Sequence, residues 1–245
     1  MKSVRRLGMA AAAVAGLMTA LPSPAQQQPR TMPTAPAWYF GGGAGVSWPQ
    51  FTGSDWNNVA SGLNGVGLNG GGPAFTQSSS HDNTAFGWKV FGGYRVNPYF
   101  GVETSYANFN KFDYNYQFQQ AGVQTGTADM TYKSYSVNLA LVPRLPLEQG
   151  LYVQGKIGAA FTRTENTVNM TLPTFTQQTS SSKSKTNLLA GAGLGYDFPN
   201  GLGVIVEYEY YGQVGTAFSY SPTDGIQGTG RANMNLFTAS GMIRF

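Results

Sequence analysis

Eight stretches of this chain alternate apolar and polar side chains with a period of two, and this alternation constrains the fold more than any other feature. Successive side chains of a β-strand point to opposite faces, so each stretch predicts a strand with one apolar face. In the last stretch, Phe237 and Ile243 share one face, whereas Thr238 and Ser240 share the other. The eight predicted strands span residues 38–48, 84–96, 100–110, 131–144, 151–163, 186–198, 202–212 and 233–245.

The connections between these strands alternate in length. Short turns follow the second, fourth and sixth strands, and the other four connections are long and polar. The terminal strand needs a partner for its open edge, and pairing with the first strand closes the sheet and removes both edges. The sequence therefore predicts an all-β fold, an eight-stranded antiparallel up-and-down transmembrane β-barrel, with four long loops at 49–83, 111–130, 164–185 and 213–232.

The first short turn fixes the register of its two strands. A three-residue turn at 97–99 keeps the apolar faces together, whereas a two-residue turn would mix them. This register places Gly93 opposite Glu103 and Gly101 opposite Arg95. Arg95 and Glu103 become diagonal neighbours, within reach of an ion pair.

A second three-residue turn, at 199–201, ends in a glycine that supplies the left-handed conformation such hairpins prefer. The resulting register sets Gly193 opposite Glu207 and Gly191 opposite Glu209. Each glutamate then faces a residue that has no side chain.

The polar face of the strands is predicted to line the barrel interior. A soluble barrel of lipocalin type would show the same alternation with the faces reversed, but here the charged face is also rich in glycine, as a narrow interior requires. Charged residues make up only 11 % of the chain, against roughly 25 % in ordinary globular proteins. Aromatic residues near the strand ends suit the two membrane interfaces. These interface aromatics are Trp38, Trp48, Tyr94, Tyr135, Tyr208 and Tyr210.

The charges of the interior are nearly balanced, with five cations and four anions. Unpaired charges in so narrow a space would be costly, so we expect a salt-bridged network that fills the lumen. This network explains the charges structurally and leaves Glu207 and Glu209 no role as a catalytic carboxylate pair. The predicted lumen charge network consists of Lys89, Arg95, Glu103, Arg144, Lys156, Asp197, Glu207, Glu209 and Arg244.

The amino-terminal region predicts export. Residues 1–25 combine a basic start, an apolar core of about fifteen residues and small residues at the end, as in a signal peptide. The core is shorter than the ~20 residues that a spanning helix needs, which favours cleavage over anchoring. A Pro-rich polar segment at 26–37 is expected to be a flexible periplasmic lead-in to the barrel at 38–245. Without the leader, 12 basic and 11 acidic residues remain, so the charge gives no indication of nucleic-acid binding.

Catalytic and metal chemistry have little support in the sequence. Cysteine is absent, and the single histidine, His81, follows Ser78, Ser79 and Ser80 and precedes Asp82. These residues are consecutive in a predicted loop, whereas a catalytic triad draws its side chains from separate rigid elements. We therefore predict a non-enzymatic protein with no catalytic residue, no metal site and no cofactor.

Residues 87–109 (GWKVFGGYRVNPYFGVETSYANF) and 201–212 (GLGVIVEYEYYG), together with the terminal Arg-Phe, resemble the OmpA-like outer-membrane β-barrel superfamily, in its small porin or surface-antigen type. The resemblance covers Trp38 to Phe245 and implies an outer-membrane protein of a Gram-negative bacterium. It also implies that Phe245 is an assembly signal for the barrel-assembly machinery. The peptidoglycan-binding domain of OmpA itself is not expected here.

Two functions remain open at this stage. The first is a structural scaffold with surface-exposed loops that bind a host or environmental ligand, because the loops are low in charge and rich in Ser, Thr, Asn and Gly. The second is a small passive porin-like channel in which the charge network opens transiently. An outer-membrane lipid-modifying enzyme is a less favoured third. Outer-membrane lipid and lipopolysaccharide are the expected surroundings, and no nucleic-acid partner is expected.

Overall fold

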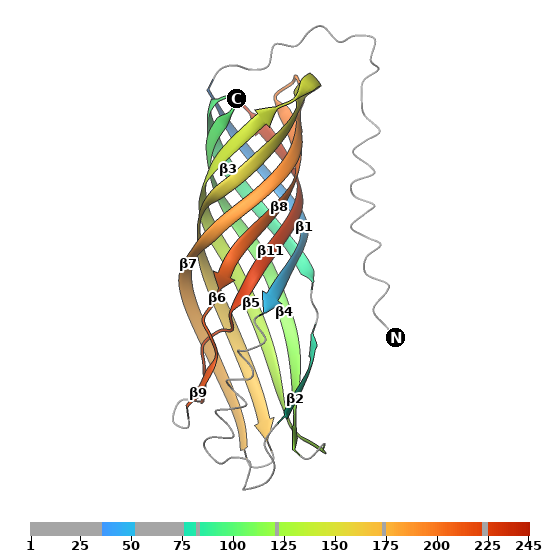
Figure 1. Ribbon diagram of the computed structural model, residues 1–245, viewed down its shortest axis with the longest axis vertical. Helices are drawn as coiled ribbons and strands as arrows, with labels where there is room; N and C mark the ends of the chain where they lie inside the picture. Colours follow the sequence, from blue (N-terminus) through green and yellow to red (C-terminus); the bar gives the residue numbers. More distant parts are fainter. Residues whose placement is uncertain (1–35, 52–75, 82–83, 121–122, 173–174, 222–224) are drawn as a thin grey trace, which may run out of the picture.

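The computed structural model describes residues 36–51, 76–81, 84–120, 123–172, 175–221 and 225–245. Eight long strands form the barrel: β1 (Ala37–Phe51), β3 (Ala85–Asn97), β4 (Phe100–Gln120), β5 (Val123–Pro146), β6 (Leu151–Leu172), β7 (Phe175–Asp197), β8 (Leu202–Val214) and β11 (Ala232–Arg244). The shorter elements are β2 (Thr76–His81), β9 (Ser219–Ser221), β10 (Gly225–Gln227) and the 3-10 turn η3 (Glu148–Gly150). Figure 1 shows the long strands tilted around one tall barrel. The predicted signal peptide and most of the predicted lead-in lie outside the described residues.

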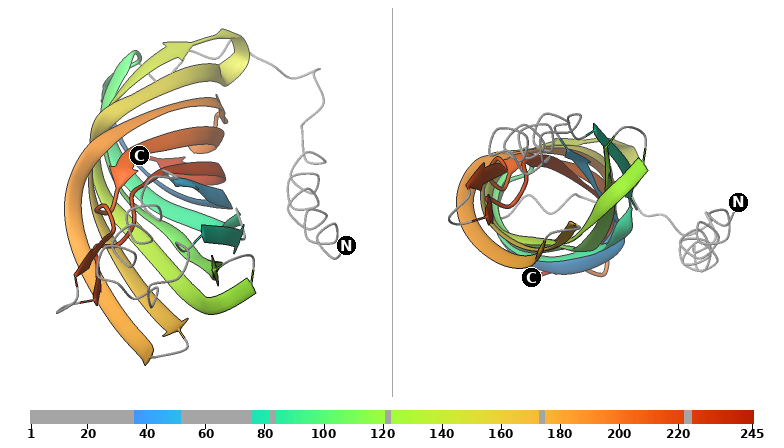
Figure 2. Two further views of the ribbon diagram at one scale, coloured as in Figure 1. Left: turned by 60° about the horizontal axis from the view of Figure 1, so that its bottom comes forward. Right: turned by 90° about the horizontal axis from the view of Figure 1, so that it is seen from below.

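The eight long strands pair in a closed antiparallel ring. The order β4-β3-β1-β11-β8-β7-β6-β5 is completed by pairing between β4 and β5, and the view along the axis shows the ring (Figure 2, right). The last strand pairs with the first, with Phe40 opposite Ile243, and Trp38 and Phe245 exchange two backbone hydrogen bonds of 3.1 Å. The predicted eight-stranded antiparallel barrel is confirmed, and closure gives each long strand a partner on both sides in the part of the barrel near the short turns.

Both predicted turn registers are confirmed. Gly93 lies opposite Glu103, and Gly193 lies opposite Glu207. Gly201 has the expected positive φ, at +85°. A Cβ atom added at Gly193 would lie 2.7 Å from Cγ of Glu207, so the missing side chain leaves the space that the glutamate occupies.

The strands reach well beyond the predicted bounds on the side of the long connections. The β4–β5 ladder continues to the pair Gln120 and Val123, and the β6–β7 ladder to the pair Leu172 and Phe175. The predictions of loops at 111–130 and 164–185 are therefore wrong. The predicted first loop also contains β2, which pairs with β4 and places His81 opposite Tyr114, while Asp82 lies outside the described residues.

In these extensions the apolar side chains face the interior and the polar ones face outward, the reverse of the arrangement near the short turns. Their polar composition therefore resembles that of a loop. In the part of the barrel near the short turns, apolar residues such as Leu139 face outward and are half-exposed, as lipid contact requires. Farther along the same strand Met130 and Tyr132 are buried, while Lys133 is exposed. The apolar side chains thus face inward where the wall leaves the membrane and meets water on its outside.

A bulge in β4 produces the same change there. Asn110 has a positive φ of 65°, and the β4–β5 register shifts between Asn108 and Lys111. Because the bulge adds a residue, Phe109 and Phe112 are both buried although their sequence separation is odd.

The described residues contain no helix that is long and apolar enough to cross a membrane.

Candidate functional site in the barrel lumen

The middle of the lumen holds a buried ionic cluster that we call the glutamate–lysine cluster. It consists of Lys89, Glu103, Lys156, Glu207 and Glu209. Lys156 Nζ lies 2.7 Å from a carboxylate oxygen of Glu103, 2.7 Å from one of Glu209 and 3.2 Å from one of Glu207. Lys89 Nζ contacts Glu207 and lies 3.0 Å from Glu209. All five side chains are at most 3 % exposed.

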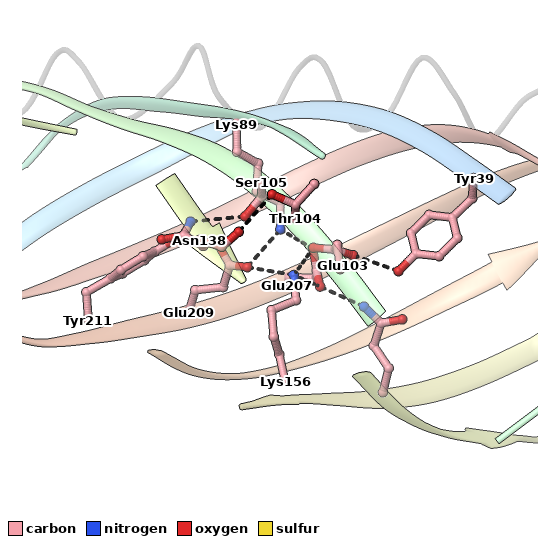
Figure 3. A network of polar contacts seen from close by, with 11 residues as sticks. Tyr39, Lys89, Glu103, Thr104, Ser105, Asn138, Lys156, Glu207, Glu209 and Tyr211 are labelled. Atoms are coloured by element: carbon pink, nitrogen blue, oxygen red, sulfur yellow. Dashed lines mark hydrogen bonds and ion pairs between the residues drawn. The ribbon is translucent and has the colours of Figure 1, made fainter. Parts of the chain in front are cut away.

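Neutral side chains complete the hydrogen bonding of this cluster (Figure 3). The Tyr39 hydroxyl donates to Glu103 over 3.1 Å, and the Tyr211 hydroxyl donates to Glu209 over 3.0 Å. The Gln154 amide donates to Glu207 over 2.8 Å. These donors come from three different strands, β1, β8 and β6. Each carboxylate is therefore held by at least one lysine and one neutral donor, which offsets the cost of burying it.

The end of the lumen on the short-turn side holds a second group, which we call the arginine–aspartate cluster. It consists of Arg95, Arg144, Asp197 and Arg244. All three guanidinium groups contact the same oxygen, Asp197 Oδ2, with Arg244 at 2.9 Å and Arg95 at 3.4 Å. The Arg144 guanidinium also stacks on Tyr152, 3.5 Å from the ring centre, a cation–π contact. Arg95 thus bonds Asp197 rather than Glu103, and the expectation of an Arg95–Glu103 pair is wrong.

A thin apolar layer lies between the two ionic clusters. Tyr39, Phe91, Tyr152, Ile205 and Met242 form one buried group. Apart from Tyr39, these apolar residues occupy lumen-facing positions on strands that also carry charged residues of the ionic clusters. Ile205 precedes Glu207 on β8, and Phe91 lies between Lys89 and Arg95 on β3.

A larger apolar cluster fills the outer part of the barrel, beyond the glutamate–lysine cluster. Aromatic and methionine side chains from the extended strands form it, and Phe218, from the connection after β8, is buried with them. Phe109 packs edge-on against Tyr211, with ring centres 4.7 Å apart. The polar composition of these segments hides this cluster in the sequence. Strict alternation at Phe112 and Tyr114, and again at Val168 and Met170, was the available signal.

The predicted interface aromatics lie on the outer surface in two groups. Trp38 and Tyr94 pack together near the short turns, with ring centres 4.9 Å apart. Trp48 and Tyr208 pack at the other end of β1, with ring centres 6.0 Å apart. Tyr135 contacts Tyr106, at 5.9 Å between ring centres. Tyr210 is half-buried on β8.

Comparison with solved structures finds several small outer-membrane barrels. The attachment invasion locus protein Ail of Yersinia pestis, solved in complex with the heparin analogue sucrose octasulfate, is 16 % identical, with a TM-score of 0.40, over 86 % of this chain and 99 % of that protein. Neisserial surface protein A is 13 % identical, with a TM-score of 0.44, over 85 % of this chain and 97 % of that one. OprG from Pseudomonas aeruginosa is 11 % identical, with a TM-score of 0.45, over 86 % of this chain and 97 % of that one.

No curated protein sequence matches the chain. The family comparison does find a match, to the OmpA-like transmembrane domain, over residues 33–236. The matched region begins before β1 and ends within β11, so it contains nearly the whole ring of strands. The chain therefore belongs to the OmpA-like transmembrane family, the β-barrels of the Gram-negative outer membrane.

Proposed function

We propose that the protein is a non-enzymatic surface scaffold, a closed barrel that holds two long external hairpins ready to bind a ligand. The observation that carries this proposal is the filling of the lumen by the glutamate–lysine cluster, with the apolar cluster packed beyond it, toward the external hairpins. An ion that crossed this barrel would have to displace paired charges and then pass a layer of buried aromatic and methionine side chains. A filled lumen of this kind favours a rigid scaffold over an open channel.

The external hairpins supply the binding surface in this proposal. From Arg163 to Leu172, β6 extends about 30 Å beyond the membrane-facing part of the strand. On the facing strand, Ser180, Ser182 and Ser184 are exposed. A hydroxyl row of this kind offers many hydrogen bonds and little charge. It suits a neutral polar ligand, such as a glycan or a polar protein surface.

The test is adhesion by whole cells that display the protein. A triple variant, Ser180→Ala, Ser182→Ala and Ser184→Ala, removes the exposed hydroxyl groups and leaves the buried side chains of the β6–β7 hairpin unchanged. We expect it to fold as the parent does, as shown by the shift between unheated and heated samples in a gel, and to lose adhesion to glycan-coated or protein-coated surfaces. A Gly241→Ala variant, altered only on the lipid-facing wall, is the matched control. Equal adhesion by the parent, the triple serine variant and cells without the protein would overturn the proposal.

A small channel remains the second candidate, because the two lysines share their carboxylates. Lys89 and Lys156 both contact Glu207 and Glu209, so either lysine can change partner without becoming unpaired. Single-channel recording of the refolded protein in a planar bilayer tests this candidate. Under the scaffold proposal we expect a silent bilayer, and reproducible openings would support the channel instead.

A further inference from the structure

We infer that the lumen, on the inner side of the arginine–aspartate cluster, holds a binding site for one small monovalent anion, of the size of a halide ion. The first observation is an imbalance of buried charge. The arginine–aspartate cluster sets three guanidinium groups against one carboxylate, for a local charge of +2, and its side chains are only 7–10 % exposed. Buried charge of one sign is costly unless a counter-ion neutralises it.

The second observation is that the hydrogen-bond donors of this cluster are only partly used. The three guanidinium groups converge on a single oxygen, Asp197 Oδ2. Among the described residues, the buried Nε atoms of Arg144 and Arg244 have no hydrogen-bond partner, and neither does the buried hydroxyl of Tyr152. An unpaired buried donor destabilises the fold, because it has lost its hydrogen bonds to water without gaining others. An anion accepts from such donors, whereas a cation cannot.

The third observation is a cavity whose lining includes two of these three donor residues, Arg144 and Tyr152. This cavity, of about 10 Å³, lies between the two ionic clusters, and its lining also includes Arg95, Tyr39, Gln154 and Glu103. This volume is at the lower limit for one water molecule, so the cavity takes a single small occupant. The size excludes a phosphate group or a carboxylate ligand, and Glu103 on one wall limits how much negative charge the cavity accepts.

The charge of the whole lumen network fits a monovalent ion. The glutamate–lysine cluster, with two lysines and three glutamates, carries −1, and the arginine–aspartate cluster carries +2. The nine residues therefore carry +1 together, and a single monovalent anion brings the network to neutrality. The alternative occupant is a water molecule that bridges an arginine Nε to Asp197 Oδ1, which also has no partner among the described residues.

Chloride NMR linewidths distinguish the two occupants. The refolded protein in detergent micelles is added to sodium chloride, and bromide is then used as a competitor at constant ionic strength. We expect the wild-type protein to broaden the chloride signal and bromide to reverse the broadening. A linewidth that does not change when protein is added would overturn the inference in favour of water.

Two substitutions with opposite expected effects separate binding from mere disruption of the cluster. Arg144→Gln removes a donor and a positive charge, so we expect chloride affinity to fall about tenfold or more. Asp197→Asn removes the competing carboxylate at nearly constant shape, so affinity should rise roughly tenfold. Arg163→Gln, a half-exposed arginine of the outer wall, is the control and should behave as wild type.

The proposed site would be overturned if chloride affinity changed in the same direction in the Arg144 and Asp197 variants. It would also be overturned if the Arg144 variant broadened the chloride signal as much as wild type. If Arg144→Gln does not fold, Arg95→Gln carries the same expectation. The measurement uses neither the external hairpins nor any surface ligand. Its failure would leave the proposed scaffold function untouched.

Discussion

Removing Lys156 is the sharpest test of what the glutamate–lysine cluster contributes to the fold. Its ammonium group contacts three carboxylates. Among the described residues it is the only ion-pair partner of Glu103. In the variant Lys156→Met, the apolar part of the side chain is retained while the charge is lost. Among the described residues, Glu103 then keeps only the hydroxyl of Tyr39 as a hydrogen-bond partner, and the remaining cluster of Lys89 with three glutamates carries −2.

The expected cost follows from the burial of the partners that are left. Removing one member of a buried ion pair costs about 3–5 kcal/mol, because the other charge stays desolvated and uncompensated. With a urea dependence of about 1–3 kcal/mol per M, the unfolding midpoint should fall by about 1–5 M. The double variant Lys156→Met with Glu103→Gln returns the cluster to −1. It should recover a large part of the loss, with a coupling energy of up to about 3 kcal/mol.

The assay is urea unfolding of the refolded protein in lipid vesicles, followed by the gel shift between folded and unfolded forms. The control is Arg163→Gln, since Arg163 and Glu165 are half-exposed and 3.5 Å apart. An exposed pair of this kind contributes about 0–1 kcal/mol. Equal midpoints for Lys156→Met and the control would refute the idea that the buried cluster stabilises the barrel. A double variant with a lower unfolding midpoint than the single variant would refute the charge-balance explanation.

Three further expectations follow from single positions. Gly193→Ala puts a Cβ atom 2.7 Å from Glu207 and should cost about 1–3 kcal/mol in urea unfolding. In Gly241→Ala the added Cβ atom meets nothing within 4 Å, so this variant should unfold at the same urea concentration as the parent. An equal loss of stability in the two glycine variants would contradict the steric explanation. Phe245→Ala removes an exposed ring that stacks on the ring of Phe40, with ring centres 5.9 Å apart. We expect this variant to reduce the amount of folded protein in outer membranes. The free energy of unfolding of the refolded protein should change by no more than about 1 kcal/mol. A lower midpoint with normal membrane amounts would argue against an assembly role. Glu207→Gln should leave planar bilayers silent, because the apolar cluster closes the barrel independently, and openings specific to this variant would show that the ionic cluster is the gate.

The sequence alone was sufficient for the barrel and for its local registers. A period of two assigns each side chain to a face, and a short turn fixes which residues of two neighbouring strands lie opposite each other. Both kinds of information are local, so the positions of Gly93 opposite Glu103 and of Gly193 opposite Glu207 could be predicted. The lengths of β4 to β7 could not be predicted from composition, because a strand that leaves the membrane becomes polar on its outer face and resembles a loop.

Which charges meet was decided by the tertiary structure alone. Lys89 contacts Glu207 and Glu209 across 118 and 120 residues of sequence, and Arg95 meets Asp197 across 102. Alternation says that these side chains face the lumen, but it does not give their height along the barrel axis. That height depends on the tilt and stagger of all eight strands together, which are fixed only when the ring closes. Closure therefore separates one predicted network into a cluster of −1 and a cluster of +2, with apolar side chains between them.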